Sequence, residues 1–215
     1  MENKTISFVP TNPTTPAPNG KDGPKGASGT NGTDASYSYD GGNCKHNCSS
    51  PATRGSDGGQ GGAGLKGTDG FDGVAGPIST MTLTTVIGDL TVVAGAGNGQ
   101  TGGNGGNGGP GGDGGYGGNW NPNGYTDIGN SCNGGSNAAN GNTGPQGTGG
   151  PGGNAGNGGA GAQVIIYYTE ITGNITTNIV NSQPGAAGSG GAIGGTNGAP
   201  GKVGVPSKIT LIPLT

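Results

Sequence analysis

Glycine recurs at every third residue over most of the chain, and this period restricts the possible folds more than any other feature. One run holds glycine in steps of three from Gly55 to Gly76 without a break. The same step recurs in Gly20–Gly32, Gly102–Gly117, Gly141–Gly159 and, with one change of phase, Gly185–Gly204. A flexible linker does not require such a period, so we expect ordered structure.

The chain has too few apolar side chains for an ordinary core. Of 215 residues 58 are Gly, and only 27% are hydrophobic, whereas ordinary domains are roughly half apolar. Backbone hydrogen bonds between neighbouring segments must therefore supply much of the order.

Two ordered structures place glycine at every third position: the collagen triple helix and the polyglycine II bundle. Proline, at 15 of 215 residues, is scarcer than the roughly 15–20% or more of collagen-like chains. A second glycine in triplets such as GGN, GGP and GGD gives a second packing edge, which favours a bundle. The predicted fold class is irregular or repeat: bundled polyglycine II helices, three residues per turn, with short β-hairpins and little α-helix. The first two tracts, Gly20–Gly32 and Gly55–Gly76, are compatible with either a collagen triple helix or a polyglycine II bundle.

Two segments between the tracts are rich in Thr and β-branched residues, and each has a turn signal at its centre. STMTLTTVIGDLTVVA carries Gly88-Asp89, and QVIIYYTEITGNITTNIVN carries Gly173-Asn174. This pattern predicts two β-hairpins. The terminal segments KTISFVP and SKITLIPL are also strand-like. They could join a small sheet within the chain or pair with a neighbouring subunit's edge.

The alternation of tracts and strand-like segments suggests one continuous architecture with a distinct beginning. We expect residues 1–54 to form an N-terminal segment with a collagen-like tract and a Cys-bearing loop. Residues 55–215 should form the glycine-rich polyglycine II and β region.

Charge and hydropathy exclude several classes of protein. The net charge is −3 and the 8 Lys and Arg residues are scattered, which argues against nucleic-acid binding. No apolar run approaches the roughly 18–20 residues of a membrane span. The first residues lack the features of a secretory signal. We expect an extracellular, cell-surface, spore-surface or virion protein that is released by lysis, deposited on a spore or exported by another route.

The inventory of reactive side chains is poor. There is one histidine, His46, and only Glu2 and Glu170 are glutamates. No set of nucleophile, base and orienting group can be assembled. The segment C-K-H-N-C around His46 lacks the second ligand pair of a zinc site. The sequence therefore predicts a protein that is not an enzyme, with no metal and no cofactor.

Three cysteines are candidates for a disulfide or an intermolecular cross-link. Cys44 and Cys48 lie in the first insertion of the glycine pattern, and Cys132 lies in the second. Cys132 could pair with either of the others if the two insertions meet, and one cysteine would remain for a link between molecules.

The two insertions also hold the candidate receptor-binding residues. Tyr37 and Tyr39 belong to the first insertion; Tyr116, Trp120 and Tyr125 flank or occupy the second. Loops rich in aromatic, Asn and Gly residues on a rigid scaffold suit carbohydrate or protein recognition. The other interpretation is that these residues cap the ends of the bundle.

The GGNGGNGGPGGDGG tract, together with its Asn- and aromatic-rich loops, resembles the receptor-binding tip adhesins of T-even-type phage long tail fibres. The resemblance covers roughly Gly95 to Gly161. It implies a sandwich of polyglycine II helices with host-binding loops at its end. NGGAGAQVIIYYTEITGNITTN is similar to glycine-rich repeats of bacterial surface proteins, and the GXX tracts are similar to glycine-rich antifreeze proteins of springtails.

These observations predict a non-enzymatic structural or adhesive subunit of an extracellular or virion-borne fibre, which assembles with itself as a homo-oligomer or filament. The alternative is a phage tail-fibre tip adhesin that binds a host surface receptor through its aromatic loops. An ice-binding protein is the third and most distant interpretation.

Overall fold

The computed structural model describes residues 4–12 and 15–215, and the chain divides into two compact units. Unit 1 consists of Met1–Lys21, Leu65–Gly106 and Gly150–Thr215. Unit 2 consists of Asp22–Gly64 and Asn107–Gly149. The boundary expected between residues 54 and 55 stays a prediction, because the compactness of a unit does not show whether it folds alone.

The regular structure is three small three-stranded sheets. Sheet A of unit 1 contains β1 (Lys4–Phe8), β5 (Leu90–Gly95) and β8 (Ile175–Val180) in that order. Sheet C of unit 1 contains β4 (Ile78–Val86), β7 (Gln163–Ile171) and β9 (Lys208–Pro213). Sheet B of unit 2 contains β2 (Ser36–Asp40), β3 (Lys45–Ser50) and β6 (Ile128–Asn130).

The predicted fold class, a bundle of polyglycine II helices with short β-hairpins, is therefore wrong. All strand pairs are parallel except the antiparallel pair β2–β3. The described residues contain no α-helix, and the 3₁₀ turn η1 spans Cys132–Gly135. The prediction failed because it assigned the main packing to the glycine tracts and only a minor role to the apolar segments. Each apolar segment instead forms a strand that pairs with another strand far along the chain.

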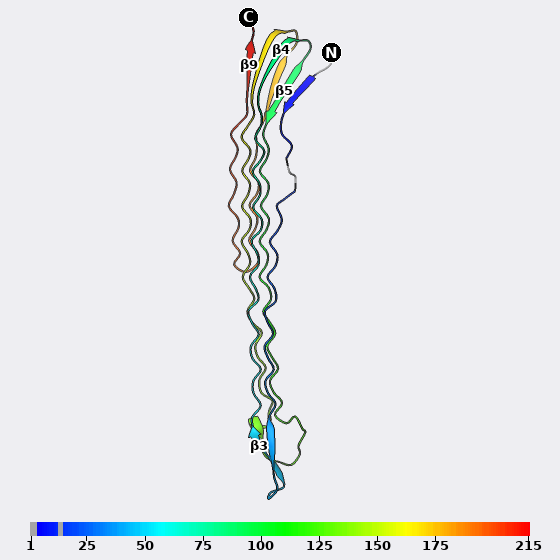
Figure 1. Cartoon of the computed structure of the whole chain (residues 1–215), viewed down its shortest axis with the longest axis vertical. Helices are drawn as coiled ribbons and strands as arrows, with labels where there is room; N and C mark the ends of the chain where they lie inside the picture. Colours follow the sequence, from blue (N-terminus) through cyan, green and yellow to red (C-terminus); the bar gives the residue numbers. More distant parts are fainter. Residues whose placement is uncertain (1–3, 13–14) are drawn as a thin grey trace. The chain divides into compact units, whose positions relative to one another are not determined.

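The two hairpins predicted in unit 1 are also absent. β4 and β5 are consecutive strands (Figure 1), but β4 belongs to sheet C and β5 to sheet A. β7 and β8 are divided between the two sheets in the same way. The connections at Gly88-Asp89 and Gly173-Asn174 therefore carry the chain from one sheet to the other. Val86 and Leu90 therefore do not pair with each other: each pairs within its own sheet, and both join one hydrophobic cluster.

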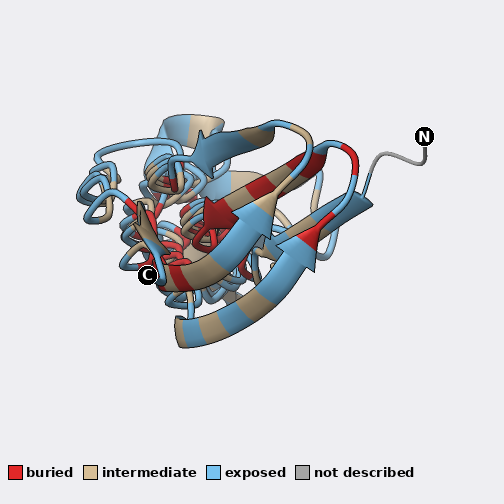
Figure 2. Ribbon diagram, turned by 90° about the horizontal axis from the view of Figure 1, so that it is seen from above, coloured by how far each residue is buried: buried red, intermediate tan, exposed pale blue. Residues whose placement is uncertain are grey.

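Sheets A and C share the hydrophobic core of unit 1. Its buried members come from the central strands β5 and β7, from the end of β4 and from the residue before β7: Val86, Leu90, Val92, Ala94, Ala162, Val164 and Ile166. Buried and less buried residues alternate along these strands, as Figure 2 shows by colour. Alternation places every second side chain against the opposite sheet. The few apolar residues of the chain are thus concentrated where two sheets meet.

An offset of 85 residues recurs between neighbouring segments of the chain. Ile78 on β4 pairs with Gln163 on β7, and Leu90 on β5 pairs with Ile175 on β8. Side-chain hydrogen bonds follow the same step, since Asp22 Oδ1 accepts from the backbone N–H 85 residues later. We call each stretch of about 85 residues, which consists of an outgoing and a returning arm, a pass of the chain. Each pass lies beside the previous one, and corresponding arms run in the same direction. This repeat explains why the sheets of unit 1 are parallel.

The glycine tracts lie outside helices and strands, and they hydrogen-bond to one another through their backbones. In unit 2 every third N–H of the first tract donates to the next pass at 2.7–2.9 Å: Gly23 to Asn107, Gly26 to Pro110 and Gly29 to Asp113. In unit 1 the N–H groups of Gly99, Gly102 and Gly105 donate in the same way to Gln183, Ala186 and Ser189. A Cβ atom on Gly109 would overlap the carbonyl oxygen of Pro24. Glycine is required there because backbones touch.

The third pass of the chain is short. Ile193 and Gly194 form a turn in the left-handed region, with φ of 61° and 82°. After this turn the offset falls to 45 residues, as in the hydrogen bond from the N–H of Ala199 to Asn154 Oδ1. The third pass therefore has no counterpart of the segment Asn107–Gly149 that belongs to unit 2.

Candidate recognition site

Sheet B of unit 2 gathers both insertions of the glycine pattern into one place. The antiparallel pair β2–β3 sets Tyr37 opposite Cys48 and Tyr39 opposite His46. β6, from the second insertion, lies parallel to β3 and pairs with His46 through Ile128. The antiparallel pair forms because a short turn between Asp40 and Lys45 lets successive strands meet directly.

A disulfide joins the two insertions. Cys48 on β3 bonds Cys132 at the start of η1, with 5.1 Å between their Cα atoms. Of the two partners left open for Cys132, the structure thus uses Cys48, and Cys44 is a free, exposed thiol. Cys132 is buried in a small cluster with Ala35 and Ala52. The bridge closes a long loop and therefore restricts the unfolded chain strongly.

Four aromatic rings form a continuous row across sheet B. Tyr37 meets Tyr125 edge to face, with ring centroids 5.7 Å apart. Tyr125 stacks on His46 at 3.8 Å and an interplanar angle of 14°. His46 in turn lies 5.1 Å from Tyr39. Offset and edge-to-face contacts of this kind stabilise aromatic clusters beyond the area they bury. The row brings together three of the five aromatic residues predicted to bind a receptor.

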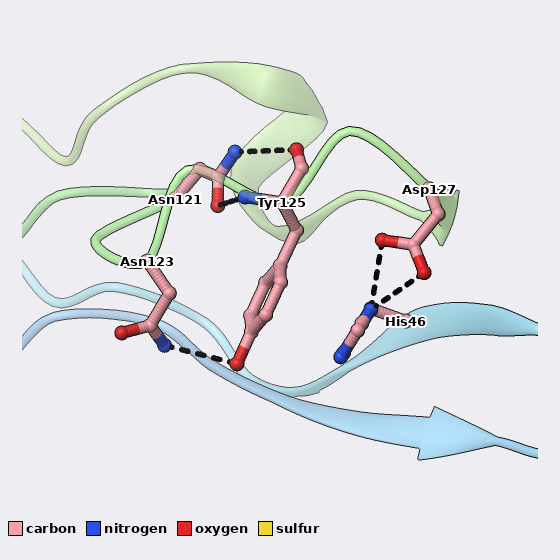
Figure 3. A network of polar contacts seen from close by, with 5 residues as sticks. All are labelled: His46, Asn121, Asn123, Tyr125 and Asp127. Atoms are coloured by element: carbon pink, nitrogen blue, oxygen red, sulfur yellow. Dashed lines mark hydrogen bonds and ion pairs between the residues drawn. The ribbon is translucent and has the colours of Figure 1, made fainter.

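Polar groups fix the row in position (Figure 3). His46 Nδ1 lies 2.9 Å and 3.0 Å from the two carboxylate oxygens of Asp127. Asn121 brackets Tyr125, because its amide accepts from the Tyr125 N–H and donates to the Tyr125 carbonyl, both at 2.9 Å. Asn123 Nδ2 donates to the Tyr125 hydroxyl at 3.2 Å. The loop therefore holds Tyr125 at both its backbone and its hydroxyl.

The electrostatics of the row centre on Asp127. The hydrogen bond from His46 lowers the pKa of the Asp127 carboxyl below its usual value. The contact with the Cys44 side chain, burial and the charge of Asp127 together raise the pKa of Tyr39. Asp127 thus carries its charge over the neutral pH range, and Tyr39 keeps its hydroxyl proton. The row presents one carboxylate among hydroxyl, amide and ring surfaces.

The two other predicted aromatic residues lie outside the row. Tyr116 is highly exposed, with 72% of its surface accessible. It lines a shallow depression of about 410 Å³ together with Asp113, Asn140 and Thr143. Trp120 is half-buried, and its backbone N–H donates to Asn137 Oδ1 at 3.0 Å. Neither ring contacts the row within the part of the chain that the structure describes.

The sequence analysis missed Asp127, Asn121 and Asn123 as site residues and considered His46 only as a metal ligand. The N-P-N-G turn at Asn121–Gly124 was a usable signal, because Asn side chains in such turns bond to the backbone and fix the loop. The pairing of His46 with Asp127 had no local signal. In the described residues no group of three or more His, Cys, Asp or Glu side chains could hold a metal ion. No helix among them is long and apolar enough to cross a membrane.

No known protein family and no curated protein matches the sequence. Among solved structures, the chain is 20% identical to a springtail antifreeze protein from Granisotoma rainieri, a bundle of nine polyproline type II helices whose crystal waters match the ice lattice. The match covers 88% of this chain and 95% of that chain, with a TM-score of 0.14. A TM-score this low supports no conclusion about the fold or function of this chain.

Proposed function

We propose that the chain is a non-enzymatic adhesive and structural subunit of an extracellular or virion-borne fibre. Its recognition element is the aromatic row of unit 2, and its ligand is a carbohydrate or protein on a host surface. The observation that supports this proposal best is the union of two distant insertions by the Cys48–Cys132 disulfide. A loop that is held this firmly binds with little loss of conformational entropy.

Within the row, the surface available to a ligand is unequal. His46 is mostly covered, with 19% of its side chain exposed, whereas Asp127 has 41% exposed. Tyr39, at the end of the row, is 56% exposed. We infer that Tyr39 and Asp127 touch the receptor, while Tyr37, Tyr125 and His46 support them. Tyr is common at recognition surfaces because it offers a large contact area with few rotatable bonds.

Binding of the purified chain to host cells, or to their isolated surface polysaccharides and proteins, tests this proposal. Tyr39→Ala and Tyr125→Ala should each weaken binding by about tenfold or more. Phe71→Ala is the control, since Phe71 is an even more exposed aromatic residue that lies in unit 1. Equal binding by Tyr39→Ala, Tyr125→Ala and the control would contradict the proposed recognition site.

The alternative is a discrete phage tail-fibre tip adhesin that binds a host surface receptor through its aromatic loops without forming filaments. Electron microscopy of the purified chain, with its mass measured in solution, separates the two. Long uniform filaments support the fibre subunit, and compact monomers or trimers that bind the host support the tip adhesin.

A further inference from the structure

We propose that copies of this chain associate head to tail through the sheet edges of unit 1. In this arrangement β8 and β9 of one copy pair with β1 and β4 of the next, and both sheets continue from copy to copy. The inference rests on the self-associating part of the proposed function and names the surfaces that would carry it.

The topology makes the two sides of unit 1 complementary. β1 and β4 are the first strands of sheets A and C, and β8 and β9 are the last. Within each sheet all strands run in the same direction. The first strand of a second copy can therefore pair in parallel with the last strand of this copy, just as it pairs with the middle strand of its own chain. Parallel addition to an open edge restores the ladder that the edge lacks. A second copy therefore has the required polarity without any rearrangement.

Two of the four edge strands lack the usual protection against such pairing. Exposed edges are normally guarded by charged residues, proline or bulges. β4 (ISTMTLTTV) and β8 (ITTNIV) contain no charged residue and no proline. In β1 and β9 the charged residue is the first of the strand, Lys4 or Lys208, and Pro213 is the last residue of β9. The middle of every edge is thus free to pair.

The apolar surfaces of the two sides also match. On the first side, the end of β1 borders a hollow of about 370 Å³ whose lining includes Phe8, Val9 and Pro77. Phe8 and Ile179 share the partner Ala94 on β5, so in the same register Ile179 of one copy lies opposite Phe8 of the next. On the other side, β8 exposes Ile179 and Val180 by 45% and 42%. Side chains that project from one side could enter the hollow of the other. A contact between two different surfaces does not close on itself, so repetition of it builds a filament.

Cysteine cross-linking between two proteins that each carry one free cysteine tests the register directly, in a Cys44→Ser background that keeps the Cys48–Cys132 disulfide. Thr5, Thr91 and Thr176 lie side by side across sheet A. If β1 of a second copy follows β8, its Thr5 lies opposite Thr176. Within one chain Thr5 and Thr176 are two strand spacings apart, about 10 Å, which is too far for a disulfide. A mixture of the Thr5→Cys and Thr176→Cys proteins should therefore form a covalent dimer under mild oxidation.

Each of the two variant proteins incubated alone is the matched control and should give at least tenfold less dimer. Dimers that form equally well from one protein alone would overturn the head-to-tail pairing, and so would the absence of dimers from every sample. If the unmodified chain still forms filaments in that case, the proposed fibre function stands and only the assigned edges are wrong. The Tyr39→Ala binding test decides the adhesive function independently.

A second pair of variants tests the role of one backbone N–H donor on the open edge of β8. The N–H of Leu90 donates to the Asn174 carbonyl, so alternation along β8 directs the N–H of Thr177 to the open edge. Thr177→Pro removes that donor, and Thr177→Val retains it. Filaments or oligomers should be lost with proline and kept with valine, while circular dichroism shows that both proteins fold. Equal assembly of the two variants would contradict pairing through β8.

Discussion

Asp72 Oδ1 accepts a hydrogen bond of 2.6 Å from the backbone N–H of Asn157, which stands 85 residues later in the chain. Asn157 repeats the arrangement, because its own Oδ1 accepts from the N–H of Lys202 at 2.9 Å. Short polar side chains of one pass thus bond to the backbone of the next, and the same bond recurs three residues away between Asp69 and Asn154. The backbone bonds of the tracts also repeat every three residues. The side-chain bonds supply acceptors for backbone N–H groups that lie between those of this ladder.

Replacing Asn157 should therefore destabilise unit 1. Asn157→Ala removes the acceptor for Lys202 and should lower the free energy of unfolding by about 1 kcal/mol. Asn157→Asp keeps an acceptor oxygen and should cost less. Urea denaturation of the three proteins measures the difference. Equal midpoints for the alanine and aspartate variants would show that this acceptor does not contribute.

Glycine substitutions should have effects that depend on backbone contact rather than on exposure alone. A Cβ at Gly109 would overlap the Pro24 carbonyl oxygen, whereas a Cβ at Gly41 meets nothing within 4 Å. Gly109→Ala should therefore destabilise the protein by roughly 1–3 kcal/mol, and Gly41→Ala should be close to neutral. Thermal unfolding of both variants is the measurement. A neutral Gly109→Ala would show that the tracts can separate without cost.

The disulfide should carry a large share of the stability of unit 2. Replacing both Cys48 and Cys132 with serine should cost about 2–5 kcal/mol and should increase hydrogen exchange in β2, β3 and β6. Cys44→Ser is the control, because Cys44 is a free thiol outside the bridge. Unchanged protection of β3 in the double variant would mean that the aromatic row holds the loops without the bridge.

Acid should destabilise the protein below about pH 4, near the ordinary pKa of aspartate. The backbone N–H of Asn142 lowers the pKa of Asp57, and His46 lowers that of Asp127. The pKa values of Asp40 and Asp69 are lowered as well. A carboxyl whose pKa is lower in the folded state stabilises the fold above its unfolded pKa, and this contribution is lost as pH falls through the folded pKa. The melting temperature should stay level down to about pH 4 and then fall.

The double variant Asp57→Asn with Asp127→Asn tests whether these two carboxyl groups cause the loss of stability in acid. It retains acceptor oxygens but cannot titrate, so its melting temperature should fall less between pH 4 and pH 2. A drop as steep as that of the unmodified chain would assign the acid sensitivity to other groups.

The sequence alone revealed the period of the glycines but not the sheets. Strand propensity in the segments around Val86 and Leu90 was visible, yet the turn between them was interpreted as a hairpin. Local signals do not distinguish a turn within one sheet from a bend between two sheets, since both place Gly and Asp between apolar runs. Only the partners 85 residues away decide between them, as in the pairing of Leu90 with Ile175.

For the candidate site, composition pointed to the insertions and to their tyrosines, because aromatic residues are scarce elsewhere in the tracts. The sequence did not show which of these rings contact one another. Tyr125 stacks on His46, which lies 79 positions earlier, and Tyr116 points to a separate surface although it is near Tyr125 in sequence. These contacts depend on the disulfide and on strand register, and neither has a local signature.

The short third pass shows how the chain can change in length without losing its fold. At Ile193 and Gly194 a tight turn replaces everything that corresponds to Asn107–Gly149, and the segments on both sides of it still meet their neighbours in register. A deletion inside a pass leaves the backbone contacts in register when the outgoing and returning arms lose matching triplets. Recombination that adds or removes paired triplets in the gene would therefore preserve the frame while the loops at the ends of the passes vary.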